Sequence, residues 1–190
     1  LKTITASTTA NGQYNTAIGS NSMRDASGGN LNIAIGNETL NNNISGSKNV
    51  AVGNQSLYNN SSGDENVGVG HETLFNNLSG KENTAIGKLA LHENISGSQN
   101  TAIGVQSLYY VTSGVHNVGI GYQSQYLSNS IYNTSVGDST LSSIASSIHS
   151  SHNSAFGFNS LRNLKIGGNN IAMGYNSMTD CTDGSFNIGI

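Results

Sequence analysis

The chain has 190 residues, a net charge of −3 at pH 7, only 9% charged residues and no proline or tryptophan. Seven Lys and Arg residues spread over this length do not form the basic patch that binding to nucleic acid or to an anionic membrane requires. No apolar run approaches the ~20 residues of a membrane-spanning helix. We therefore expect no nucleic-acid partner and no membrane insertion.

An internal repeat organises the sequence. After a lead-in segment of residues 1–14, a pentad of the form Asn-x-small-aliphatic-Gly recurs through a single repeat domain of residues 15–190. Successive pentads are spaced by 17 residues six times, then by 16, 20, 17 and 17. Such regularity indicates a solenoid in which each repeat forms one coil. The asparagines that open the complete pentads are Asn15, Asn32, Asn49, Asn66, Asn83, Asn100, Asn117, Asn133, Asn153 and Asn170.

The rest of each repeat follows a common pattern, which we number from the pentad Asn as position 0. Position 2 is Ala, Gly or Ser, position 3 is Ile, Val, Phe or Met, and position 4 is Gly. Position 8 is Leu or Met in each complete repeat except one, where it is Gln125. A Ser-Gly pair follows in most repeats, as at Ser96 and Gly97. The pentad alternates like a strand, and the glycines predict the corners at which the coil turns.

This pattern predicts an all-β protein, a parallel β-solenoid of about ten 17-residue coils with two short strands in each coil. Such a period is too short for a pair of helices and their turn, and each glycine would destabilise a helix by about 1 kcal/mol. Coils stacked at roughly 4.8 Å would give a rod roughly 50 Å long. Stacking in register places the pentad asparagines above one another, so we expect a ladder of side-chain amide hydrogen bonds.

The interior of such a coil is thin, because each repeat offers only about three or four large apolar side chains. We expect the residues at positions 1 and 3 to fill the coil, which leaves the small residues at position 2, such as Ala85 and Ala102, as a flat outer strip. Contact between such strips in a homotrimer would bury this apolar surface. In the reverse arrangement, the aliphatic residues would meet at the trimer axis. The expected partner is in either case the chain itself.

The N-x-A-I-G pentads, followed by a small residue and Leu, resemble the heads of YadA-like trimeric autotransporter adhesins, which are left-handed parallel β-rolls. The 17-residue form, as in residues 49–66, is similar to repeats of bacteriophage tail fibres and related surface proteins. The resemblance covers residues 15–190. It implies a homotrimeric fibre, extracellular, on a cell surface or on a virion, that attaches to a host glycan or protein receptor. It implies no catalytic residue.

Aromatic residues form the first candidate binding surface. Position 9 of five consecutive coils carries Tyr58, Phe75, His92, Tyr109 and Tyr126. Both a packing ladder and a sugar-binding stripe fit this pattern, because aromatic rings pack on one another and also on pyranose rings. Further amphipathic aromatic residues lie nearby in the sequence, and they extend the candidate set to Tyr110, Tyr122 and Tyr132.

The second candidate surface is an irregular coil within residues 122–152, where the period changes and Ser-Gly pairs are missing. The 20-residue repeat that begins at Asn133 has three extra residues, which we expect to form a loop that contacts a receptor. Its candidate binding residues are Ser143, His149 and His152. A trimer could bring three copies of the pair His149 and His152 together and bind a metal ion. Surface histidines in a Ser-rich loop are much commoner, so we expect no metal ion and no cofactor.

Two other functions remain as alternatives to an adhesive fibre. A glycan-cleaving tail protein needs two carboxylates that face one sugar bond, but the acidic residues here fall on different coils, and we expect no enzyme. An ice-binding or mineral-binding solenoid would present a flat face of threonines. Thr84 and Thr101 fit such a face, whereas Val50, Val67 and Val118 interrupt it.

Overall fold

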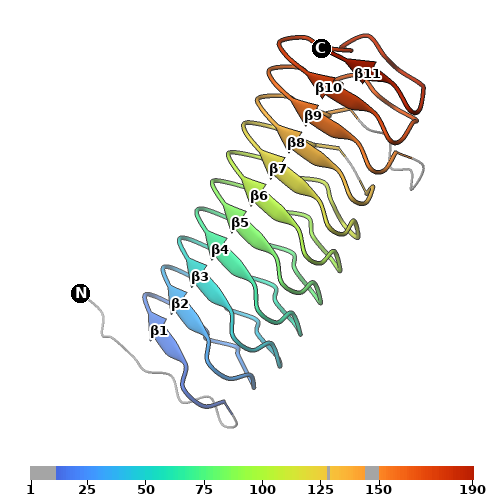
Figure 1. Cartoon of the computed structure of the whole chain (residues 1–190). Helices are drawn as coiled ribbons and strands as arrows, with labels where there is room; N and C mark the ends of the chain where they lie inside the picture. Colours follow the sequence, from blue (N-terminus) through green and yellow to red (C-terminus); the bar gives the residue numbers. More distant parts are fainter. Residues whose placement is uncertain (1–11, 128, 144–149) are drawn as a thin grey trace.

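The computed structural model describes residues 12–127, 129–143 and 150–190 as one straight solenoid rod (Figure 1). Each pentad contributes one short strand, and the strands are parallel and pair in chain order within a single sheet. The predicted all-β parallel solenoid is thereby confirmed. The strands are β1 (Thr16–Ile18), β2 (Ile33–Ile35), β3 (Val50–Val52), β4 (Val67–Val69), β5 (Thr84–Ile86), β6 (Thr101–Ile103), β7 (Val118–Ile120), β8 (Thr134–Val136), β9 (Ser154–Phe156), β10 (Ile171–Met173) and β11 (Ile188–Gly189).

Neighbouring strands pair like residues with like residues. Ala85 of β5 pairs with Ala102 of β6, and Ile86 pairs with Ile103. The strands β7, β8 and β9 keep this register, although the repeats that join them have 16 and 20 residues. The irregular coil within residues 122–152 therefore leaves the pairing of the sheet intact.

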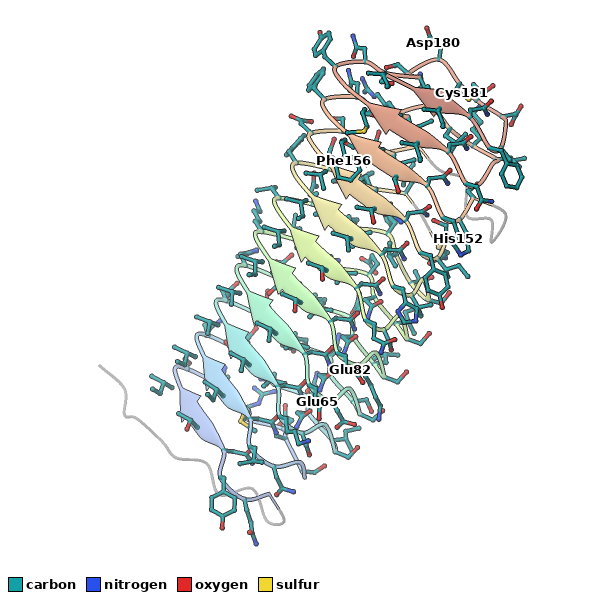
Figure 2. The ribbon with its side chains drawn as sticks, viewed as in Figure 1. Glu65, Glu82, His152, Phe156, Asp180 and Cys181 are labelled. Carbon is teal, nitrogen blue, oxygen red and sulfur yellow. The ribbon has the colours of Figure 1, made fainter. Side chains whose placement is uncertain are left out.

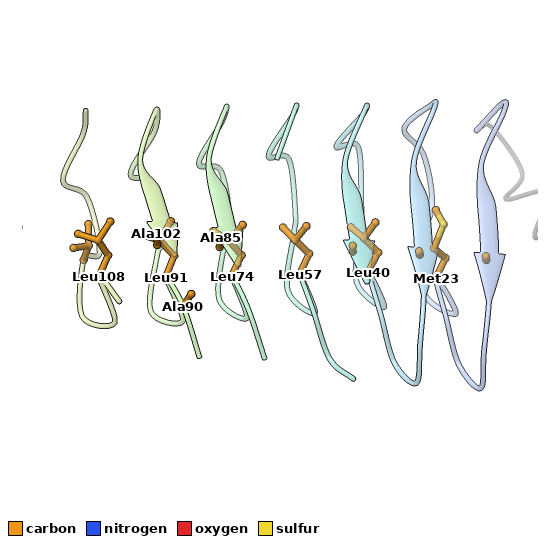
Figure 3. Close-up of a cluster of buried hydrophobic side chains, with 13 residues drawn as sticks. Met23, Leu40, Leu57, Leu74, Ala85, Ala90, Leu91, Ala102 and Leu108 are labelled. Carbon is orange, nitrogen blue, oxygen red and sulfur yellow. The ribbon is translucent and has the colours of Figure 1, made fainter. Parts of the chain in front are cut away.

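The strands bury their small residue and expose their aliphatic ones, so the predicted outer strip of small residues is wrong. Ala85 is fully buried, whereas Ile86 is 40% exposed. The reason is the volume of the coil. Leucines at position 8 project from the opposite wall into the interior and stack in one column (Figure 3). At Gly68, even an added Cβ would lie only 2.6 Å from Ser56 Oγ and 3.4 Å from Leu57 Cδ1, so only small residues fit at position 2.

The prediction of two strands per coil is also wrong, because the return side of the coil is not extended. Position 6, position 8 and the residue before the next pentad Asn have a positive φ. In the coil of residues 83–99 these are Leu89 (φ 61°), Leu91 (φ 49°) and Gln99 (φ 59°). Left-handed residues interrupt a strand, but the backbone still bonds between coils: the Leu91 N–H donates to the Ser107 carbonyl oxygen at 3.0 Å.

These left-handed positions also restrict the sequence. A branch at Cβ makes a positive φ especially unfavourable, so Val, Ile and Thr are poor choices at such positions. None of the non-glycine residues with a positive φ in the described chain is Val, Ile or Thr. The choice of residue is restricted even more strongly at position 4. Gly87 has φ 122°, and an added Cβ there would lie 2.7 Å from the Gly104 carbonyl oxygen. Only glycine is compatible with that corner.

The apolar core divides at the coil of residues 117–132. One cluster of buried apolar residues ends at Val111, and a second begins at Leu141. Between them, Gln125 occupies position 8, and its buried Nε2 donates to Asn117 Oδ1 at 3.1 Å. Polar bonds thus replace apolar packing in one coil of the rod.

We predict that Leu91→Ile destabilises the rod more than Leu91→Met does. Both side chains have nearly the volume of Leu, so each packing change costs under about 1.5 kcal/mol. Only Ile adds a Cβ branch at φ 49°, which we expect to cost roughly 1–3 kcal/mol more. Thermal and urea midpoints, followed by circular dichroism, compare the two variants. Equal midpoints would show that the left-handed conformation of Leu91 places no limit on the side chain.

Candidate functional site

The pentad asparagines form the expected ladder of amide hydrogen bonds inside the rod. Asn83 Nδ2 donates to Asn66 Oδ1 at 3.1 Å and to the Gly97 carbonyl oxygen at 2.8 Å. Its Oδ1 accepts the backbone N–H and the Nδ2 of Asn100 at 3.0 and 3.2 Å. The Asn83 amide therefore bonds to the coils on both sides, and its buried polar atoms are satisfied. This column is structural, because its side chains are buried.

A second buried amide ladder, which the sequence analysis did not anticipate, occupies position 11. Asn60 Nδ2 donates to Asn43 Oδ1 at 2.8 Å, and Asn77 Nδ2 donates to Asn60 Oδ1 at 2.7 Å. The ladder ends at Asn94, whose Oδ1 has no hydrogen-bond partner among the described residues, because Val111 follows at position 11. The signal in the sequence is an Asn at the same position of four consecutive repeats.

The glycine of the Ser-Gly pair joins the two ladders. The Gly97 carbonyl oxygen accepts Asn83 Nδ2 at 2.8 Å and Asn94 Nδ2 at 2.9 Å. An added Cβ at Gly97 would collide with Asn94 Oδ1. This glycine is therefore required for close approach of the amides.

The strand face is an exposed surface of the rod that is rich in apolar side chains. We define it as the outward side chains at positions 1 and 3 of β1 to β11. Figure 2 shows these side chains along the outer surface of the sheet, with Phe156 labelled on β9. Exposed members of the strand face include Ile18, Ile33, Ile35, Val69, Ile86, Ile103, Phe156, Ile171 and Met173.

The aromatic residues at position 9 form one continuous stack. Ring centroids lie 5.1 Å apart between Tyr58 and Phe75 and between Phe75 and His92, and 5.0 Å apart between His92 and Tyr109. Tyr126 extends the stack from Tyr109 at 5.4 Å. The rings of the first four members are within 5° of parallel. The inner rings use both faces on their neighbours, so their edges are what they offer to a ligand.

A second stack lies at the residue that precedes the pentad Asn. His116 and Tyr132 have ring centroids 4.7 Å apart, and Tyr132 and His152 have centroids 5.0 Å apart. The same position carries Glu65 and Glu82 on earlier coils, along one edge of the rod (Figure 2). The candidates Tyr132 and His152 therefore belong to an exposed ladder on that edge, with His116 as an additional member.

Tyr110 and Tyr122 lie beside the first stack. Tyr110 is nearly perpendicular to Tyr109 and Tyr126, at interplanar angles of 73° and 84°. Burial and the neighbouring charge and hydroxyl of Tyr110 raise the pKa of the Tyr126 hydroxyl, and Tyr122 adds to this rise. Tyr110 and Tyr122 are 44% and 48% exposed. The structure thus brings four of the predicted tyrosines together on two adjacent coils.

His92 joins two acidic residues to the first stack. Its Nδ1 lies 2.8 Å from Glu93 Oε1, and its Nε2 lies 3.5 Å from Glu72 Oε2 on the preceding coil. His71 Nε2 lies 3.5 Å from the other oxygen of Glu72. Glu72 and Glu93 fall on different coils, as expected, but both contact His92, because position 6 of one coil meets position 9 of the next.

The remaining candidates belong to the 20-residue repeat. Ser143 is half-buried, and its backbone N–H donates to the Arg162 carbonyl oxygen at 3.1 Å, as part of the bonding between coils. His149 lies outside the described residues, so its place in the loop stays a prediction. In the described part of the chain, no group of three or more His, Cys, Asp or Glu side chains could hold a metal ion.

We predict that Asn83→Asp strongly destabilises the rod at neutral pH. The change removes two donors and points a carboxylate at Asn66 Oδ1 and the Gly97 carbonyl oxygen, which can only accept. Asn100 still donates to one oxygen of this buried carboxylate, but the other oxygen faces two acceptors, which should cost at least about 3 kcal/mol. The fold then favours the neutral form and raises the pKa of the introduced carboxyl. Relative to the parent chain at the same pH, the loss should shrink as the pH falls through this raised pKa, and the recovery should be complete below about 4, the pKa of the carboxyl in the unfolded chain.

The matched control is Asn37→Asp, because Asn37 is exposed at position 5. Thermal midpoints at pH 7 and at pH 3.5 compare both variants with the parent chain. If Asn83→Asp lost no more stability at pH 7 than Asn37→Asp, the amide ladder would not require an amide.

Comparisons of the chain with models of known protein families, with curated protein sequences and with solved structures find no match. A search of the described residues for a helix long and apolar enough to cross a membrane also finds none.

Proposed function

We propose that the chain is a structural and adhesive segment of a homotrimeric fibre, displayed outside a cell or on a virion, which attaches to a host or surface receptor. The observation that carries the proposal is the strand face. It presents a continuous column of large apolar side chains at position 3 of β1 to β10, beside a mixed column of Thr, Ser, Val and Ile at position 1, whereas the core residues behind it are fully packed.

An exposed apolar surface of this kind supports association with another macromolecule. Apolar patches larger than a few hundred Å² are rare on monomers and mark interaction surfaces. Burial of the strand face contributes about 25 cal/mol for each Å² of apolar surface removed from water. Since all coils have nearly the same rise, copies of the chain side by side meet with each coil at the height of its counterpart. A cyclic trimer with its axis along the rod fits this regularity.

The other sides of the rod support the adhesive role. They carry the aromatic stacks, the tyrosines of residues 109–126 and pairs such as Lys81 Nζ and Asp64 Oδ2, 2.7 Å apart. The buried amides and leucines hold the coil, so the outward residues can differ from coil to coil without loss of the fold. In this proposal, the strand face joins the chains and the other sides meet the receptor.

We predict that the chain has three times its monomer mass of 19.7 kDa in light scattering. The double variant Ile86→Lys with Ile103→Lys should be a monomer, because assembly would bury the added charges without partners. Circular dichroism of the variant should match that of the parent chain, since both side chains point to solvent and their coils keep the core.

The matched control is Leu78→Lys with Ile95→Lys. These residues are similarly exposed and lie on adjacent coils at position 12, outside the strand face. The control should keep the trimer mass. A parent chain of monomer mass, or a loss of assembly in both double variants alike, would contradict the role of the strand face.

The outward orientation of the side chains at positions 1 and 3 also supports a second candidate, an ice-binding or mineral-binding surface. Thr16, Thr84, Thr101 and Thr134 lie at position 1 of the strand face, next to aliphatic residues at position 3. This function needs the face to be free, so it predicts a monomer that shows thermal hysteresis or adsorbs to mineral. A trimer without thermal hysteresis would count against it.

The geometry gives less support to a glycan-cleaving protein. Glu72 and Glu93 are two acidic residues that the structure brings to one place from adjacent coils, but both carboxylates contact the nitrogens of His92. The imidazole ring occupies the space between them, where a scissile sugar bond would have to lie. We therefore propose a role in attachment without cleavage.

A further inference from the structure

Tyr110 interrupts a polar column on the surface of the rod. Position 10 is Asn42, Asn59, Asn76 and Glu93 on the preceding coils, and hydrogen bonds of 2.9 to 3.0 Å join these four side chains in order. At Tyr110 the column becomes apolar, and Leu127 continues it on the next coil. Both side chains are more than 40% exposed. A large aromatic ring therefore lies in solvent directly beyond a row of hydrogen-bonding groups.

One face of the Tyr110 ring is covered and the other is turned away from the protein's aromatic cluster. Tyr109 uses both of its own faces, on His92 at 5.0 Å and on Tyr126 at 5.4 Å. The close contact of 4.5 Å between Tyr109 and Tyr110, at 73°, must therefore involve the edge of Tyr109 and a face of Tyr110. Tyr110 is 44% exposed, and among the described residues its ring contacts are with Tyr109 and Tyr126, so no aromatic ring stacks on its opposite face, in contrast to the inner rings of the stack.

An acidic flank lies beside this ring on the preceding coil. Glu93, one coil below in the same column, accepts Asn76 Nδ2 at 3.0 Å through Oε2 and contacts His92 through Oε1. Burial and the Glu93 carboxylate raise the pKa of the Tyr109 hydroxyl, in line with a negative environment beside the tyrosines. Glu72 adds a second carboxylate on the far side of His92. The flank can accept hydrogen bonds from hydroxyl groups, and it repels anions.

We propose that Tyr110 is the stacking platform of a glycan-binding subsite that takes a neutral pyranose. The ring of such a sugar has an apolar C–H face that fits a flat aromatic surface, and hydroxyl groups at its rim that can donate to Glu93. The acidic flank selects against uronic and other acidic sugars. The inference rests on the proposed function, because it names the chemical class of receptor that the fibre binds.

The test uses saturation-transfer NMR on the whole chain with methyl β-D-pyranosides of glucose, galactose and mannose as probes. We expect transfer to the ring C–H protons of at least one probe, and weaker transfer to methyl β-D-glucuronide, which differs from the glucoside by a carboxylate. Tyr110→Ala should weaken apparent binding about tenfold, whereas Tyr110→Phe, which keeps the ring, should retain it. Tyr175→Ala, which removes another exposed tyrosine at 75% exposure, is the matched control.

The outcomes separate this inference from the proposed fibre. Light scattering and circular dichroism on the same samples report assembly and folding. A folded trimer that transfers saturation to none of the neutral probes would overturn the glycan subsite and leave the fibre standing. Binding that survives Tyr110→Ala, or that prefers the glucuronide, would also overturn it. Binding by a folded monomer, lost in Tyr110→Ala alone, would support the subsite and contradict the trimer.

Discussion

The hydrogen bonds that the buried amide of the pentad Asn requires constrain the path of the rest of the coil. Its Oδ1 accepts both the backbone N–H and the side-chain Nδ2 of the next pentad Asn, while its own Nδ2 donates to the preceding Asn and to a carbonyl oxygen across the coil. A buried amide with missing partners is costly, so each turn of the chain must return an Asn to the same place. The repeats of 16 and 20 residues keep an Asn at this place: the Asn133 backbone N–H donates to Asn117 Oδ1, and Asn153 Nδ2 donates to Asn133 Oδ1. At Asn117, Gln125 Nε2 donates in place of the amide of the next pentad Asn.

The amides occupy interior volume that a larger solenoid would fill with apolar side chains. One Leu from the return wall and one Ala from the strand nearly complete the cross-section, as the close contacts around Gly68 show. The bulky residues of the pentad must then point outward. The apolar strand face and the polar core thus have one cause, the small volume inside the coil. A chain with so little apolar interior gains much from contact with a second surface.

The period, the parallel strands and the Asn ladder could be predicted from the sequence, because each depends on residues that recur at fixed spacing. Which face of each strand points into the coil could not be predicted. Alternation along NTAIG shows that Ala85 and Ile86 lie on opposite faces, but it does not say which face is inside, and the usual preference for buried Ile gave the wrong answer. The deciding factor is the inward Leu91, which comes from another part of the coil. The positive φ of Leu89 and Leu91 could not be predicted from the sequence for a related reason. Leu is an ordinary strand residue, and only its neighbours in space require the left-handed conformation.

The candidate site was predicted in part. The column of Tyr58 to Tyr126 follows from spacing alone, and the structure shows it as a continuous stack. The spacing of the aromatic residues in the sequence could not show that the inner rings contact their neighbours with both faces. It also could not show that one face of Tyr110 has no aromatic ring stacked on it. The contact between Glu72 and His92 could not be predicted from the sequence either, because it joins different positions of adjacent coils.

Strict pairing of each strand with the next one in the chain gives the rod a length that can change only in whole steps. Removal or addition of one repeat shortens or extends it by one strand spacing, about 4.8 Å, and leaves every other coil with an equivalent neighbour. Two surface features separated by a given number of coils are therefore held at a fixed distance along the rod. A solenoid of this kind can evolve its reach and the spacing of its contacts independently of the contacts themselves.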